Sequence, residues 1–72
     1  MQEKLIKIMK EALETDIVNL DDHLNSFDNW DSLTRLSIIA LIDEYFEVQI
    51  SDIEFNEFKT IRDILNSLNN KL

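Results

Sequence analysis

The sequence has 72 residues, of which 44% are hydrophobic, and its formal net charge is −8. This length allows one domain, spanning residues 1–72, with a modest core, and the apolar fraction argues against disorder. The absence of cysteine excludes disulfides, thiolate metal sites and a cysteine nucleophile, and the single histidine, His23, excludes a multi-histidine metal site.

The negative charge is concentrated in the middle of the chain. Residues 11–57 hold 13 of the 15 acidic residues and one basic residue, Arg35, which leaves a local balance of −12. Nucleic acid and anionic membranes are therefore poor partners, whereas basic protein surfaces are good ones. The alternative is that the acidity serves solubility alone. No apolar run approaches the roughly 20 residues of a membrane span, and no uncharged signal-like run follows the N-terminus, so we expect a cytoplasmic protein without membrane insertion.

A first helix is predicted over residues 3–13, where apolar residues recur at helical spacing. A polar connection over residues 14–30 follows it. Connections of this length are usually functional or tied down by their own apolar residues. We expect a short helical turn near residues 21–24, a surface position for His23, and four anchors to the core: Ile17, Leu20, Leu24 and Phe27.

The most apolar helix is predicted over Ser32–Phe46, with Asp31 as its N-cap. Steps of about 100° per residue separate its apolar residues into two groups. The first group is expected to face the core: Ile38, Ile39, Ile42, Tyr45 and Phe46. The second group lies roughly opposite among carboxylates and indicates a docking surface: Leu33, Leu36 and Ala40. The alternative is that Leu33 and Leu36 pack beneath the preceding connection.

The start of this helix carries the most informative residues. The Ser32 hydroxyl stands where unpaired backbone N–H groups and the positive end of the helix dipole favour an anionic group such as phosphate. Trp30 is either a packing anchor or a stacking platform for a ligand. Arg35 falls near the core side, so either its stem packs with its head in solvent, or it has a role near Ser32.

The last third of the chain predicts an extended segment and two helices. Residues 48–50 are extended, and Ser51 with Glu54 forms a capping-box pattern that opens a short helix over residues 52–57. We expect this helix to bury Ile53, with Phe55 as a second candidate. Thr60 and Asp63 repeat the capping pattern before a last helix whose end, residues 69–72, is expected to fray and whose inner face is Ile61, Ile64, Leu65 and Leu68. The predicted fold is all-α, a small four-helix bundle with three longer helices, a short third helix and a long first loop.

These residues form no credible catalytic set, but in combination they resemble the acyl carrier protein family. Asp31-Ser32-Leu33 matches the attachment motif of that family. Residues 41–46, 48–53 and 60–64 are similar to its second-helix end, its link into helix three and the start of its last helix. The resemblance covers about residues 28–68 without a gap and implies an acyl-carrier type of bundle.

The resemblance implies a non-catalytic carrier. The Ser32 hydroxyl would be esterified to 4′-phosphopantetheine from coenzyme A, and Asp31 would help to present Ser32 to the phosphopantetheinyl transferase. The thiol of the arm would hold acyl intermediates as thioesters for enzymes of fatty-acid, polyketide or other specialised biosynthesis. The core would part between the second and third helices to shelter an acyl chain, with Ile38, Ile42, Phe46, Ile53 and Ile61 as its lining.

The same resemblance implies weak, salt-sensitive docking of a monomer to its loading enzyme and to downstream synthase or transferase enzymes with basic docking patches. Leu33, Leu36 and Ala40 would supply apolar contact. A set of carboxylates would steer those enzymes: Asp43, Glu44, Glu47, Glu54 and Glu57.

Several residues depart from the usual family pattern. Asn29 and Glu47 stand where the family commonly has glycine, so a left-handed backbone is expected at Asn29, and at Glu47 it would cost up to about 1 kcal/mol. Trp30 is similar to the residue in small free-standing carriers of specialised pathways. Two alternatives stay open: a peptidyl or aminoacyl carrier loaded by an adenylating enzyme, with the same Ser32 chemistry, and a small helical adaptor without any modification.

Overall fold

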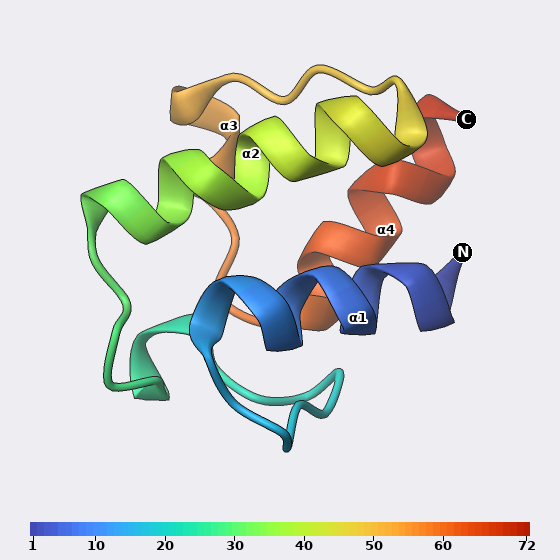
Figure 1. Cartoon of the computed structure of the whole chain (residues 1–72). Coiled ribbons are helices and arrows are strands. Elements are labelled where there is room, and N and C mark those ends of the chain that lie inside the picture. The colour runs from blue at the N-terminus through green and yellow to red at the C-terminus, as the bar shows by residue number, and fades with distance from the viewer.

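The computed structural model describes all of residues 1–72 and contains four α-helices and no strand. These are α1 (Gln2–Leu13), α2 (Ser32–Phe46), α3 (Asp52–Phe55) and α4 (Ile61–Lys71), with a 3-10 turn, Leu24–Ser26, in the first connection. Figure 1 shows both termini at one end of the molecule and the start of α2 at the other. The predicted all-α bundle with three longer helices and a short third helix is confirmed. None of the helices has the length and hydrophobicity that a membrane span requires.

One apolar cluster of 14 buried residues holds the helices together. The predicted inner face of α4 is confirmed, since all four of its expected residues are buried. In the segment between α2 and α3, Val48 and Ile50 are buried while Gln49 is exposed, as an alternating extended segment requires. The last helix continues through Lys71 rather than fraying from residue 69, because the Lys71 ammonium lies 3.1 Å from the Glu54 carboxylate.

The long first connection is anchored at three of its four predicted residues. Ile17 is exposed and its neighbour Val18 is buried instead, since adjacent side chains outside a helix point in different directions and only one can reach the core. Leu24 is buried, and Leu20 and Phe27 pack partly against the core, as expected. The helical turn begins at Leu24, later than predicted.

Backbone hydrogen bonds also join this connection to the start of α4. The Leu24 N–H donates to the Lys59 carbonyl at 2.9 Å, and the Arg62 N–H donates to the Leu20 carbonyl at 2.8 Å. Arg62 Nε also lies 2.8 Å from the Asp21 carboxylate, and this hydrogen bond lowers the pKa of Asp21. These pairings explain how so long a connection stays ordered without a regular element of its own.

The third helix buries Phe55, the second of its two candidates, and leaves Ile53 at the surface. Ile53 is 80% exposed and Phe55 is 1% exposed. A helix of four residues presents only one side chain squarely to the core, and here the larger ring takes that place. Phe55 stacks on Trp30 with ring centroids 6.0 Å apart and meets Phe58 edge-on at 5.3 Å. Of the two alternatives for Trp30, the packing anchor is therefore confirmed.

Two helices end on a glutamate with a left-handed backbone. Glu47 follows α2 with φ 56° and ψ 37°, as considered from the sequence, and Glu14 follows α1 with φ 54° and ψ 45°. The left-handed backbone expected at Asn29 is wrong. Asn29 instead joins α1 to α2, because its Nδ2 donates to the Leu13 carbonyl at 2.9 Å and its own carbonyl accepts from the Thr34 hydroxyl at 2.8 Å.

Replacing Glu47 by glycine is expected to raise the free energy of unfolding by up to about 1 kcal/mol. Glycine has no Cβ and adopts the left-handed conformation without the steric cost that glutamate carries. Glu44→Gly is the matched control, since it removes the same charge from regular helix and should lower stability by about 1 kcal/mol. Urea denaturation measures both, and destabilisation of similar size in the two variants would contradict the interpretation.

On α2 the buried face is narrower than predicted. Ile38 and Ile42 are fully buried, and Ile39 and Phe46 are partly buried. Tyr45 is about half exposed, contrary to the expected core position, and lies over α1 beside Lys4 and Lys7. Its amphipathic ring tolerates that exposure.

Candidate functional site

Ser32 is the first residue of α2 and is exposed at the surface. The preceding residue, Asp31, has an extended backbone and caps the helix, since its Oδ1 accepts from the Thr34 N–H at 2.8 Å. Asp31 therefore performs the capping role that Ser32 would otherwise serve, and the Ser32 hydroxyl is left free for chemistry. The predicted helix start and cap are confirmed.

The electrostatics of this corner are set by Asp31. The hydrogen bond from the Thr34 backbone N–H lowers the pKa of the Asp31 carboxyl. Asp31 is therefore ionised at neutral pH, at the helix end where a negative charge is favourable. An exposed hydroxyl at the N-terminus of a 15-residue helix fits a phosphate ester, because the first N–H groups of the helix point towards such a group.

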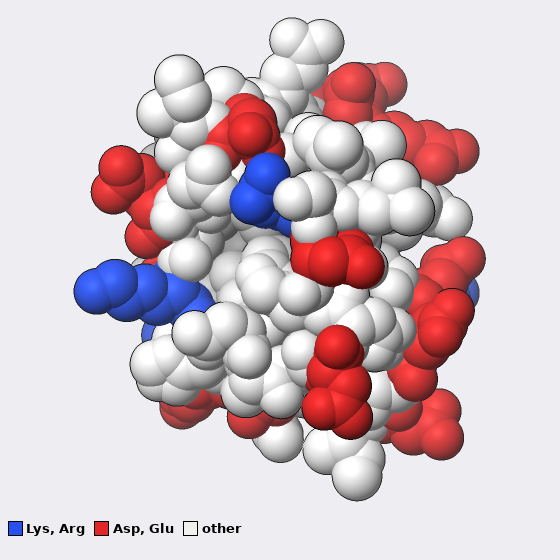
Figure 2. Space-filling view, turned by 90° about the vertical axis from the view of Figure 1, so that its left-hand side faces the viewer, with Lys and Arg blue, Asp and Glu red and all other residues white.

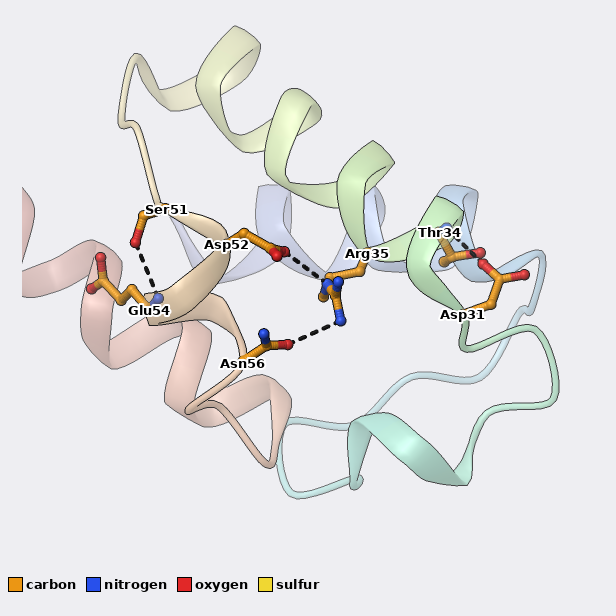
Figure 3. Close-up of polar contacts among 7 residues, drawn as sticks. All are labelled: Asp31, Thr34, Arg35, Ser51, Asp52, Glu54 and Asn56. Carbon is orange, nitrogen blue, oxygen red and sulfur yellow. Dashed lines mark hydrogen bonds and ion pairs between the residues drawn. The ribbon is translucent and has the colours of Figure 1, made fainter.

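Arg35 joins α2 to α3 rather than pointing to Ser32. Figure 3 shows its guanidinium directed at the two ends of α3, where Nε lies 3.0 Å from Asp52 Oδ1 and Nη1 donates to Asn56 Oδ1 at 2.9 Å. The side chain is 24% exposed, and the buried Nε makes an ion pair without hydrogen-bond geometry. The stem of Arg35 is packed, as one of the two alternatives predicted. Its guanidinium, however, contacts α3 instead of lying in solvent.

Two side chains hold α3 from its other side. The Ser51 hydroxyl caps the helix by accepting from the Glu54 N–H at 3.1 Å. The Glu54 carboxylate does not return to Ser51 but turns to α4, where it accepts from the Ser67 hydroxyl at 3.0 Å and pairs with Lys71. Polar contacts to α2 and α4 therefore supplement the single buried ring of this short helix.

Replacing Arg35 by methionine is expected to loosen α3 selectively. Methionine keeps an apolar stem but loses both contacts to α3, and a partly exposed ion pair of this kind contributes at most about 1 kcal/mol, or roughly a five-fold change in local opening. Native-state hydrogen exchange at the Phe55 and Asn56 amides should accelerate to that extent, while the amides of α1 are unchanged.

The matched control is Arg62→Met, which removes the other arginine–aspartate pair of the protein, the one with Asp21. It should leave exchange in α3 unaltered. Equal acceleration in both variants, or none with Arg35→Met, would show that the Arg35 contacts do not hold α3.

The predicted docking face of α2 is at the surface. Leu33 is 74% exposed, Leu36 is 51% exposed and Ala40 is exposed, so the alternative in which the two leucines pack beneath the connection is wrong. Ile53 adds a further exposed apolar side chain that the sequence reading had assigned to the core. The hydrophobicity of Ile53 alone does not decide whether the side chain lies in the core or at the surface.

Four of the five carboxylates proposed to steer partners are exposed: Asp43, Glu44, Glu47 and Glu57. Glu54 is half-buried and already paired with Lys71, so it contributes less to the outward field than predicted. Figure 2 looks onto the end of the molecule where α2 begins; acidic side chains are scattered over that face, most of them towards its right-hand side, and basic ones are few. Such a charge distribution favours contact with basic rather than acidic molecules.

The expected acyl pocket is closed. Ile38, Ile42 and Ile61 are fully buried in the core, and Phe46 packs against it. Ile53 lies outside this group, on the surface. The structure therefore brings four of the five expected lining residues together, but as part of a filled core.

A family model described as "Phosphopantetheine attachment site" matches residues 3–68. An acyl carrier protein of Thermosynechococcus vestitus is 41% identical over 44 residues, which are 61% of this chain and 54% of that relative. An acyl carrier protein of Kocuria rhizophila is 32% identical over 59 residues, which are 82% of this chain and 73% of the relative. The chain thus matches about half the length of the first relative. No solved structure matches the chain significantly.

Proposed function

The chain belongs to the acyl carrier protein family, and from this premise we propose that Ser32 is the attachment point of its covalent 4′-phosphopantetheine. The observation that supports the assignment is the exposed Ser32 hydroxyl at the first position of α2, beside a helix cap that Asp31 already supplies. Residues 1–72 act as one carrier domain, without a catalytic set of their own.

Attachment is a phosphoryl transfer from coenzyme A. The Ser32 oxygen forms a bond to the phosphorus that bears pantetheine, the pyrophosphate P–O bond breaks, and adenosine 3′,5′-bisphosphate leaves. The hydroxyl proton passes to a base of the transferase, because this corner of the chain has only the weakly basic carboxylate of Asp31. Asp31 fixes the turn before Ser32 and so presents the hydroxyl to the transferase.

The attached arm supplies the thiol that this cysteine-free chain lacks, and that thiol holds an acyl group as a thioester. The remaining functions fall to the surface of α2. Leu33, Leu36 and Ala40 give apolar contact to partner enzymes, and the exposed carboxylates steer basic docking patches towards them. Weak, rapidly reversible docking suits a carrier that must leave each enzyme after each step.

The cargo that we propose is an acyl group. The chain presents acyl thioesters to enzymes of fatty-acid, polyketide or other specialised biosynthesis, as a cytoplasmic monomer. Its net charge of −8 favours the monomer, because like-charged copies repel one another. Its partners are the phosphopantetheinyl transferase, an acyl-loading enzyme and downstream synthase or transferase enzymes.

The test is incubation with coenzyme A and a broad-specificity phosphopantetheinyl transferase, followed by intact-protein mass measurement. A carrier gains the mass of one phosphopantetheine. An unchanged mass, under conditions that modify a control carrier protein, would establish the unmodified adaptor instead. Loading of the modified protein by an adenylating enzyme and an amino acid, but not by acyl-transferring enzymes, would identify an aminoacyl carrier.

A further inference from the structure

Thr34 ties the chain that follows Ser32 to the chain that precedes it, at two points. The Thr34 N–H donates to Asp31 Oδ1 at 2.8 Å (Figure 3), and the Thr34 hydroxyl donates to the Asn29 carbonyl at 2.8 Å. Ser32 lies between these residues and remains exposed. The turn around Ser32 is therefore closed by its neighbours, and the Ser32 hydroxyl is left free.

The helix cap alone does not fix where the start of α2 lies in the molecule. Asp31 and Thr34 are only three residues apart, so their contact orders a single turn. Asn29 supplies the link to the rest of the protein, because its Nδ2 donates at 2.9 Å to the carbonyl of Leu13, 16 residues earlier. Leu13 is the last residue of α1 and its side chain is buried. A continuous chain of hydrogen bonds therefore runs from the end of α1 through Asn29 to Thr34.

Both contacts depend on a side-chain donor. The Leu13 carbonyl is among the last four carbonyls of α1, which have no partner within the helix. The two hydrogen bonds are partly buried, so an acceptor that loses its donor is only incompletely solvated by water. The side-chain amide of Asn29 and the hydroxyl of Thr34 therefore stabilise the approach to α2 more than exposed hydrogen bonds would.

We propose that Asn29 and Thr34 are positioning residues for the modification of Ser32, and that their two hydrogen bonds, the Asn29–Thr34 clamp, hold Ser32 in place relative to α1. The inference rests on the proposed attachment at Ser32. Transfer requires the serine oxygen to lie about 3–3.5 Å from the phosphorus and in line with the leaving group, and a misplacement of about 1 Å costs up to about 100-fold in rate. Asn29 and Thr34 act through the backbone on either side of Ser32, without touching coenzyme A.

The kinetic test compares phosphopantetheinylation of the full chain and its variants by a broad-specificity transferase. Thr34→Val keeps the shape of the side chain without its donor, and Asn29→Asp replaces the amide donor by a carboxylate. Each should lower kcat about 10-fold and leave the KM for the carrier within about two-fold, since the docking face of α2 is unchanged. Thr34→Ser keeps the hydroxyl and should restore kcat to within about two-fold of the wild type. The double variant should lose less than the product of the two single losses, because either change opens the same clamp.

Backbone ¹⁵N relaxation of the unmodified chain tests the clamp without the transferase. The order parameters of the Ser32 and Leu33 amides should fall from about 0.85 towards about 0.6 in Thr34→Val and Asn29→Asp and recover in Thr34→Ser. Two matched controls should change neither these values nor kcat. Thr15→Val removes a hydroxyl that accepts from the Ile17 N–H in the same connection, and Asn25→Asp adds the same charge at an exposed position of it.

The outcomes separate the clamp from the attachment itself. A wild type that gains no phosphopantetheine overturns the attachment at Ser32, and the clamp with it. If the wild type is modified, a wild-type kcat in both Thr34→Val and Asn29→Asp overturns the clamp alone, as does a Thr34→Ser protein that is as slow as Thr34→Val. A raised KM with an unchanged kcat would show that these residues contact the transferase directly, which also overturns the proposal.

Discussion

Replacing Phe55 by alanine is expected to lower the free energy of unfolding by about 3–5 kcal/mol, the usual cost of deleting a buried aromatic ring. A domain of 72 residues is stabilised by roughly 4–11 kcal/mol in total, so this one substitution removes a large share. The expected loss is large because Phe55 is the single buried side chain of α3 and its ring contacts both Trp30 and Phe58. Urea denaturation followed by far-ultraviolet circular dichroism measures the change without relying on Trp30 as a probe.

Ile53→Ala is the matched control in the same helix. Ile53 is 80% exposed, so its truncation should change stability by no more than about 0.5 kcal/mol. A large loss with Ile53→Ala and a small loss with Phe55→Ala would reverse the assignment of which side chain anchors α3.

Reversing three charges at the end of α2 is expected to slow modification by the transferase. Asp43→Lys, Glu44→Lys and Glu47→Lys together should reduce the apparent association rate about 10- to 100-fold at low salt. We propose that these carboxylates, which lie on the face that carries Ser32 or at its end, steer basic partners towards it. The kcat/KM of phosphopantetheinylation at several salt concentrations measures this effect. The deficit should shrink as salt rises and the Debye length shortens.

The control is a second triple variant, Glu3→Lys, Glu11→Lys and Glu14→Lys, on and just after α1. It changes the net charge by the same amount and also includes one left-handed residue, Glu14, as the first set includes Glu47. It should lower kcat/KM much less. An equal loss in the two triple variants would mean that total charge governs docking, and that the end of α2 has no special role.

The helices themselves were predictable because their signals are local. The bounds of α2, its Asp31 cap and the capping box of Thr60 and Asp63 all follow from residues within one turn of each other. The burial of side chains in irregular segments and in the four-residue helix α3 was not predictable in the same way. Ile17 and Val18 have similar hydrophobicity, as do Ile53 and Phe55. In each pair the direction of the backbone decides which side chain is buried.

The site could be predicted only in part, for a comparable reason. Ser32 and its exposed neighbours on α2 follow from one helix and one motif. The partners of Arg35 lie 17 and 21 residues away, at Asp52 and Asn56, and no local pattern connects them to it. A shallow surface groove likewise needs Leu36 and Ala40 from α2 together with Ile50 from the segment that precedes α3, so no single stretch of the sequence predicts it.

The most direct measurement of the central claim is the mass of three proteins after the same treatment with coenzyme A and a phosphopantetheinyl transferase. They are the wild type, Ser32→Ala and Ser37→Ala, which removes an exposed hydroxyl from the same helix. We predict that the wild type and Ser37→Ala each gain one phosphopantetheine and that Ser32→Ala gains none. A Ser32→Ala protein that still gains this mass would contradict the assignment of Ser32 as the attachment point.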